Sequence, residues 1–342
     1  MSHIHDVLKE VSLYDDNKYV LATVIKVEGS AYRKPGTVML IHESGKMIGT
    51  LSAGCLEKDL HMRAKQLISS EKSSETYVYD MSSEDDLGWG RGAGCNGKVH
   101  VLVEKVDSNL KKHLMKIRDR LEMGQAITLI RFFNKEKSIK DYQLVPKDLL
   151  SFENAVSNLE SSAMGTTFIQ TFQPQERLII FGTGPDVLPL ASMAEQVGFS
   201  VIVWGWQKNY DQINPFLDSL SYHSSPLELF LEDMTLNQHD ALVIMTHDFE
   251  KDKEILHTLL NYEQVIGYLG VLGPRKRTVR LMKNQIIPEK VNSPVGLSIN
   301  AEGPAEIAIS ILAQVIHKKW ELRTRECVFI ERKDYGNLSS SG

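Results

Sequence analysis

The second half of the chain alternates short apolar segments with segments of helical periodicity. Strands are expected at 177–181, 200–204, 241–246 and 264–269, and an amphipathic helix at 307–317 ends the pattern. Strands that alternate with helices form a parallel sheet, because each parallel connection must cross a face of that sheet. This half of the chain therefore predicts a Rossmann-like domain, an α/β fold with a doubly wound parallel sheet.

The first strand of this half is followed by a pair of glycines. Gly182 and Gly184 stand between the strand and the next helix, where dinucleotide-binding sheets bring their backbone close to a pyrophosphate. The third glycine of that fingerprint is Val187 here, and the next strand ends at Gly205 rather than at an acid that could bind a ribose. The two glycines thus favour a dinucleotide-binding fold. The two missing features argue against NAD(P) as the ligand, and NAD(P) binding stays open as an alternative.

Two further polar residues follow strands expected in the same sheet. His247 comes directly after one strand, and Arg275 opens a helix after another. The carboxyl ends of parallel strands form the edge where doubly wound sheets bind ligands. At that edge Arg275 could bind a phosphate and His247 could accept a proton. Each has a structural alternative, a solvated basic helix turn for Arg275 and a capping role for His247.

The first half of the chain predicts an α+β domain. An apolar, β-branched strand is expected at 18–27, a hairpin at 37–50 and an amphipathic helix at 56–68. The polar, proline-containing segment 173–177 is the best boundary before the parallel sheet. We expect three parts: an N-terminal α+β domain over 1–172, a Rossmann-like domain over 173–332 and a flexible tail over 333–342.

Two of the three cysteines lie in glycine-framed turns of the N-terminal domain. Cys55 is in the run Gly54-Cys55-Leu56-Glu57, at the start of an expected helix, and Cys95 is in the run Gly94-Cys95-Asn96-Gly97. Glycine turns present backbone N–H groups to anions, and a thiol in such a place loses its proton more readily. The pattern predicts a site for a polyanionic group with affinity for sulfur.

The composition excludes several classes of protein. A net charge of -5 argues against a dedicated nucleic-acid binder. Three cysteines are too few for two iron–sulfur clusters, each of which needs about four ligands, and they suit a reducing cytoplasm better than a disulfide framework. We expect neither a signal peptide nor a membrane span, because no apolar run approaches the roughly 18 residues that a span needs.

The motifs, taken in order, resemble the XdhC/CoxI family, accessory factors for molybdenum hydroxylases such as xanthine dehydrogenase. The runs that carry the resemblance are Gly29-Ser30 with Arg33, Gly54-Cys55-Leu56-Glu57, Gly94-Cys95-Asn96-Gly97, and the segments 178–184, 245–248, 270–277 and 302–308.

The resemblance implies a molybdenum-cofactor insertion chaperone rather than a catalyst. Such a protein binds the molybdopterin cofactor, protects it or helps to sulfurate it, and delivers it to an apo xanthine dehydrogenase-type hydroxylase of purine catabolism. Cys55 and Cys95 would be the metal ligands, since molybdenum favours soft sulfur. The cofactor-binding set would comprise Cys55, Cys95, Gly54, Glu57, Arg33, Gly94, Gly97, Gly182, Gly184, His247 and Arg275. A cysteine desulfurase is a candidate second partner, and a homodimer is expected because twofold assemblies are common.

Three other hypotheses remain open from the sequence. The chain could be an NAD(P)-dependent oxidoreductase with a thiol-bearing domain, which predicts nucleotide binding at Gly182 and Gly184. It could be a xanthine dehydrogenase, or a small component of one. It could also be a cytoplasmic two-domain protein whose Rossmann-like half serves only for dimerisation and docking.

Overall fold

The protein is described by a computed structural model over residues 4–13, 18–52, 54–81, 97–146, 166–206, 221–319 and 327–330. Its contacts divide the chain into two units. The N-terminal unit comprises residues 2–174 and 325–342, and the Rossmann unit comprises residues 175–324. None of the helices in the described ranges is both long and apolar enough to cross a membrane.

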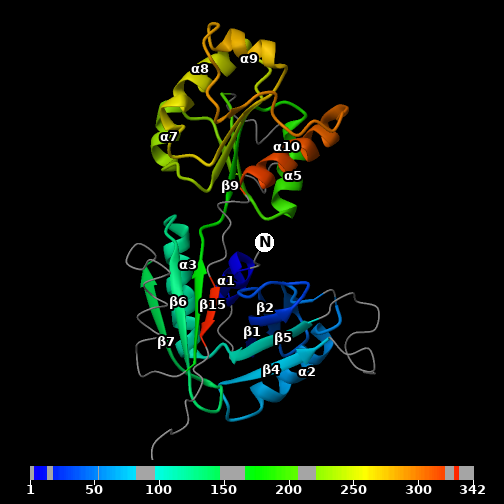
Figure 1. Cartoon of the computed structure of the whole chain (residues 1–342). Coiled ribbons are helices and arrows are strands. Elements are labelled where there is room, and N and C mark those ends of the chain that lie inside the picture. Colours follow the sequence, from blue (N-terminus) through cyan, green and yellow to red (C-terminus); the bar gives the residue numbers. More distant parts are fainter. Residues whose placement is uncertain are drawn as a thin grey trace, which may run out of the picture. The chain divides into compact units, whose positions relative to one another are not determined.

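The N-terminal unit contains two antiparallel sheets (Figure 1). The strand order of the five-stranded sheet is β3-β2-β1-β5-β4. Its strands are β1 (Tyr19–Gly29), β2 (Val38–His42), β3 (Met47–Ile48), β4 (Ser74–Asp80) and β5 (Gly97–Lys105). The order of the four-stranded sheet is β15-β8-β6-β7. Its strands are β6 (Ile127–Phe133), β7 (Ile139–Pro146), β8 (Thr167–Phe172) and β15 (Cys327–Ile330).

Both faces of the five-stranded sheet are buried, because residues 19–25 of β1 are all buried and all but Thr23 are apolar. Val20 and Ala22 point to one face, where they pack with Leu60 of α2 (Glu57–Ile68). The alternate residue Leu21 points to the other face, where it packs with α1 (Ile4–Leu13), α3 (Ser108–Glu122) and the four-stranded sheet. The period of two along a strand thus gives this unit a core on each side of its larger sheet.

The Rossmann unit contains one parallel sheet with strand order β11-β10-β9-β12-β13-β14. Its strands are β9 (Arg177–Phe181), β10 (Ser200–Trp204), β11 (Ser221–His223), β12 (Asp240–Ile244), β13 (Tyr268–Val271) and β14 (Val291–Asn292). Starting from β9, this is the order 3-2-1-4-5-6 of a doubly wound dinucleotide-binding sheet. The order reverses between β9 and β12, so the carboxyl ends of these two strands form the switch point.

Helices cover both faces of this sheet, as Figure 1 shows. The helices α5 (Val187–Gln196) and α10 (Gly303–Lys319) pack on one face. The other face is covered by α7 (Leu227–Met234), α8 (Phe249–Leu259) and α9 (Arg275–Leu281). A short 3₁₀ helix, η3 (Leu260–Tyr262), follows α8. The prediction of an α+β domain followed by a Rossmann-like domain is therefore confirmed.

The structure differs from the predicted limits of the second domain at its C-terminal end. That domain was expected over 173–332, but β15 lies antiparallel to β8, with Cys327 opposite Gln170 and Ile330 opposite Thr167. The last strand therefore belongs to the N-terminal unit, because it completes the hydrogen bonding of the edge that β8 would otherwise leave open. The unit boundary falls after Pro174. The predicted tail, 333–342, lies outside the described residues.

One predicted strand is displaced. The segment 264–269 was expected to be a strand, but β13 begins only at Tyr268. The amides of Val265 and Ile266 donate to the carbonyl of Tyr262, so these apolar residues complete a turn after η3 instead.

Candidate functional site

A cavity of about 350 Å³ in the N-terminal unit brings together three of the predicted site residues, Arg33, Gly54 and Glu57. Its walls come from the loop between β1 and β2 and from the segment between β3 and α2. Among the described residues, the lining consists of Tyr32, Arg33, Gly49, Thr50, Ser52, Gly54 and Glu57. A volume of this size suits one part of a small ligand.

Glu57 holds the glycine turn in place. Its Oε1 accepts from the amides of Leu51 at 3.2 Å and Ser52 at 2.9 Å, and its Oε2 accepts a short hydrogen bond from the Ser52 hydroxyl. Burial acts to raise the pKa of the Glu57 carboxyl, but these hydrogen bonds outweigh it and hold that pKa below its ordinary value. Glu57 is therefore an ionised residue that faces the turn with both of its oxygens.

Ser52 completes the same network from the other side. Its hydroxyl oxygen accepts from the amides of Gly54 and Leu56, each at 3.1 Å. Gly54 has a φ of 109°, a conformation that other residues rarely adopt, while a Cβ added there would meet nothing within 4 Å. The glycine is thus needed for its backbone angle, and the space beside it is open to a ligand.

Arg33 supplies the positive charge of the cavity. Its Nη2 donates to Thr50 Oγ1 at 3.3 Å, and its guanidinium lies 5.0 Å from the centre of the Tyr32 ring. Its Nε is buried and has no hydrogen-bond partner among the described residues. A buried donor without a partner is uncommon in proteins and calls for an explanation.

Cys55 does not line this cavity, although it adjoins Gly54. Its side chain is partly buried and packs against the apolar core between α2 and the five-stranded sheet. Within the described ranges, no three His, Cys, Asp or Glu side chains are grouped so that they could hold a metal ion. The assignment of Cys55 as a metal ligand therefore stays a prediction. Cys95 and Gly94, the other predicted pair, lie outside the described residues.

Gly97 has a structural role at the start of β5. A Cβ added to it would lie 2.5 Å from the carbonyl oxygen of Glu28 and 2.6 Å from that of Ser30. Such close approach of two backbone segments admits only glycine. Packing alone therefore accounts for this residue.

At the switch point of the Rossmann unit, the structure brings together Gly182, Gly184 and His247. A Cβ on Gly182 would lie 2.4 Å from the carbonyl oxygen of Met245, and one on Gly184 would lie 3.1 Å from His247 Cδ2. His247 has a φ of 62°, a left-handed conformation that costs a non-glycine residue about 1–2 kcal/mol. Its Nε2 lies 2.9 Å from Asp186 Oδ2.

This switch point does not favour a dinucleotide. Asp186 stands at the N-terminus of α5, where a pyrophosphate would otherwise approach, and its negative charge would oppose that approach. Gly205, directly after β10, offers no carboxylate for a ribose, and its Cβ position is 2.4 Å from Thr183 Cγ2. The pair of Asp186 and His247 can transfer a proton. The Asp186 carboxylate holds the half-exposed imidazole at Nε2, and Nδ1 remains available.

The sequence indicated His247 but not Asp186, its partner in the fold. An acid directly before a helix is a common N-cap signal, which concealed its link to a histidine 61 residues away.

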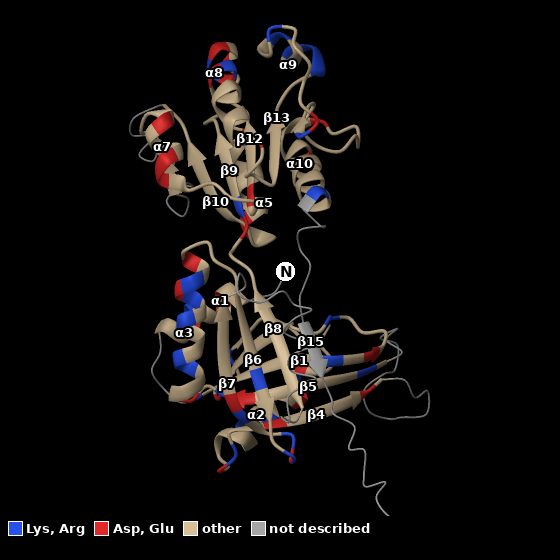
Figure 2. Cartoon of the chain, turned by 60° about the vertical axis from the view of Figure 1, so that its left-hand side comes forward, with Lys and Arg blue, Asp and Glu red and all other residues tan. Residues whose placement is uncertain are grey.

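Arg275 lies on a basic helix at the same edge of the sheet. Figure 2 shows the Lys and Arg residues gathered on α9, in contrast to the acidic α7. The Nη1 of Arg275 donates to the carbonyl of Ser293 at 3.2 Å, so the side chain fixes the segment after β14. Phosphate binding by Arg275 stays a prediction.

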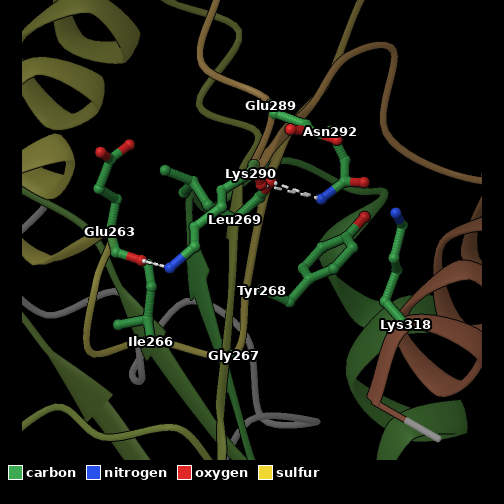
Figure 3. Close-up of a pocket in the computed structure, with 9 residues that line it drawn as sticks. All are labelled: Glu263, Ile266, Gly267, Tyr268, Leu269, Glu289, Lys290, Asn292 and Lys318. Carbon is green, nitrogen blue, oxygen red and sulfur yellow. Dashed lines mark hydrogen bonds between the residues drawn. The ribbon is translucent and has the colours of Figure 1, made fainter. Parts of the chain in front are cut away.

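A second cavity, of about 360 Å³, lies in the Rossmann unit near the amino end of β13 (Figure 3). Lys290 Nζ donates to the carbonyl of Glu263 at 2.9 Å, and Asn292 Nδ2 donates to that of Leu269 at 3.1 Å. The side chains of Lys290 and Asn292 therefore stabilise the backbone around this cavity through hydrogen bonds. Doubly wound sheets bind ligands at the opposite ends of their strands, and the cavity contains none of the predicted site residues.

Comparisons with known proteins match both units. Residues 13–80 match the XdhC and CoxI family, and residues 178–315 match the XdhC Rossmann domain. A Bacillus subtilis protein, named as one of the probable subunits of xanthine dehydrogenase, is 39% identical over 330 residues, which are 93% of this chain and 98% of that protein. The chain belongs to the XdhC and CoxI family. The resemblance inferred from the sequence motifs is thereby confirmed.

Two further similarities bear on this XdhC/CoxI chain. The molybdenum cofactor insertion chaperone PaoD of Escherichia coli is 23% identical over 316 residues, which are 90% of this chain and 86% of PaoD. The crystal structure of a xanthine dehydrogenase from Bacillus halodurans superposes with a TM-score of 0.81 at 38% identity, covering 99% of this chain and 98% of the other. Both of these proteins match nearly the whole chain.

Proposed function

We propose that the chain is an accessory protein of molybdenum-hydroxylase maturation, which binds the molybdenum cofactor and delivers it to an apo enzyme of the xanthine dehydrogenase type. The observation that carries the proposal is the cavity at Arg33, which combines a cation that has no ion pair among the described residues with an open glycine turn. The similarity to the chaperone PaoD supports the same role.

The residues of the N-terminal unit fit an anionic cofactor of this kind. Arg33 would pair with its phosphate, and the turn at Gly54 would let the backbone approach it closely. Glu57 and Ser52 would fix the shape of the turn rather than bind the ligand themselves. When bound, the cofactor supplies the molybdenum, which its dithiolene holds and for which cysteine sulfur is a further suitable ligand. Cys55 and Cys95 are the candidates for that contact.

Several finer features belong to this proposal. They are protection of the cofactor, its sulfuration with a cysteine desulfurase as second partner, a homodimeric state, a cytoplasmic location and a part in purine catabolism. Turnover of a metabolite by this chain is not required, because the cofactor carries its own chemistry into the hydroxylase.

The test is equilibrium binding of molybdenum cofactor to the purified protein, with NADPH titrated in parallel. We expect the cofactor to bind, binding to weaken in Cys55→Ala or Cys95→Ala, and NADPH to give no saturable signal. The two cysteine variants are controls for each other, because a ligand role for one predicts a larger loss in that variant alone.

The opposite pattern would overturn the proposal. If NADPH bound at the glycines of the switch point and the molybdenum cofactor did not bind, the chain would be an oxidoreductase with a Rossmann site. Gly184→Val would then abolish NADPH binding, since its side chain would crowd His247 and Asp186.

A further inference from the structure

The Arg33 side chain is a cation with donors to spare. Nη2 makes the only hydrogen bond of this guanidinium within the described residues, to a neutral hydroxyl of Thr50. Nε is buried and donates to no described group. A charged donor forms a stronger hydrogen bond with an anionic acceptor than with a neutral one, so an anion in the cavity would be a better partner for the guanidinium than the Thr50 hydroxyl.

The acid of the described lining does not pair with Arg33. That acid is Glu57, and both of its carboxylate oxygens face the turn, where they accept from Ser52 and Leu51. No ion pair joins Arg33 to any carboxylate of the described ranges. The cavity therefore keeps a positively charged donor group that attracts an anion.

The described lining favours one end of the expected ligand. None of the described residues around the cavity is a cysteine or a histidine, so none of them offers a soft metal its preferred ligand. The guanidinium of Arg33, beside the open turn at Gly54, is instead a group that commonly binds phosphate oxygens.

We propose that the Arg33 cavity is a binding site for a phosphate monoester, and that it takes the phosphate end of the cofactor rather than its metal. The assignment of that phosphate to the molybdenum cofactor rests on the proposed function, whereas phosphate binding as such does not. The metal is then bound elsewhere, outside the Arg33 cavity.

Tyr32 has a defined part in this site. The residue is 59% exposed, and the centre of its ring lies 5.0 Å from the guanidinium of Arg33, a cation–π contact that helps to orient the planar group. A lysine in place of Arg33 would keep the charge but lose both the stacking and the fork of donors.

The experiment is a calorimetric titration with inorganic phosphate at constant ionic strength. We expect saturable binding by the wild-type protein, at least about tenfold weaker binding in Arg33→Met, and an intermediate affinity in Arg33→Lys. Arg118→Met is the matched control, because it removes the same charge from α3, where Arg118 pairs with Asp119 at 2.8 Å and takes no part in the cavity. Thermal unfolding of each variant verifies that it is folded. Equal phosphate affinities in the wild type and in Arg33→Met would overturn the inference.

A second arm separates this inference from the proposed function. A phosphorylated pterin and the same pterin without phosphate are titrated alongside the molybdenum cofactor. A loss of affinity on removal of the phosphate, in the wild type but not in Arg33→Met, supports the site. If the cofactor bound and inorganic phosphate did not compete with it, the phosphate site would be rejected and the accessory role would stand. If phosphate bound at Arg33 and the cofactor did not, the accessory role would be rejected instead.

Discussion

Replacing Arg131 with methionine should lower the free energy of unfolding of the N-terminal unit by about 3–5 kcal/mol, the usual loss when one partner of a buried ion pair is removed. Arg131 in β6 and Glu104 in β5 join the two sheets, and neither side chain has any exposed surface. Arg131 Nε lies 3.1 Å from Glu104 Oε2, and its Nη1 donates to Gln170 Oε1 at 2.8 Å. Without the guanidinium, Glu104 would keep a single side-chain partner among the described residues, Tyr142, whose hydroxyl donates to Oε1 at 2.9 Å.

The protonation state of the Glu104 carboxyl group determines how large this loss of stability is. Burial raises the pKa of Glu104, while Arg131 and Tyr142 act to lower it. In Arg131→Met the pKa would rise further, and the acid would bind a proton in the folded state rather than remain charged in an apolar environment. The loss of stability should accordingly be larger at high pH than at low pH, because the folded variant has no partner for the ionised form of Glu104.

The coupling free energy between the two side chains is measured by urea unfolding of four proteins. These are the wild type, the single variants Arg131→Met and Glu104→Gln, and the double variant that carries both substitutions. We expect the double variant to recover part of the loss, since it removes the uncompensated charge along with its partner. A loss below about 1 kcal/mol in Arg131→Met would show that the pair behaves like a surface ion pair.

The sequence predicted the parts of the fold that periodicity encodes. Apolar runs such as Arg177–Phe181 and Ser200–Trp204 are long enough to be recognised, and both are central strands of the parallel sheet. The strands β11 and β14 have only three and two residues, too few for any pattern to stand out. Strand β15 has the composition of a strand, but its partner β8 lies far earlier in the chain, and no local signal identifies it.

For the site, the residue types were predictable and the contacts were not. Gly54 was predicted from its glycine-framed turn and Arg33 from the family motif, although the two lie in different loops, one before β2 and one after β3. Ser52 and Glu57 hold the turn through hydrogen bonds with backbone amides, and these bonds exist only in the folded loop. The orientation of Cys55 toward the core likewise depends on the packing of α2, which the motif around the cysteine does not encode.

Glu57→Ala should destabilise the N-terminal unit by about 2–3 kcal/mol at neutral pH, because the amides of Leu51 and Ser52 would lose a charged acceptor within a buried turn. It should also weaken phosphate binding at Arg33, since the same turn shapes the cavity. The pKa of Glu57 is held below its ordinary value, 4.5, by the Ser52 hydroxyl and the backbone amides, against the effect of burial. A carboxyl whose pKa is lowered by folding stabilises the protein above its unfolded pKa and loses that contribution as the pH falls through the folded-state pKa.

The pH dependence of the stability loss distinguishes a lost carboxylate charge from a general loss of packing, which would not depend on pH in this way. The difference in unfolding free energy between wild type and Glu57→Ala should be full at neutral pH and should shrink as the pH falls below 4.5, where wild-type Glu57 becomes protonated. Glu122→Ala is the matched control, because its carboxylate is 69% exposed and lies 3.6 Å from Arg118 at the end of α3, so it should change stability little at either pH. A difference that stayed constant across that range would mean that the Glu57 carboxylate does not act through its charge, and that the turn is held by Ser52 alone.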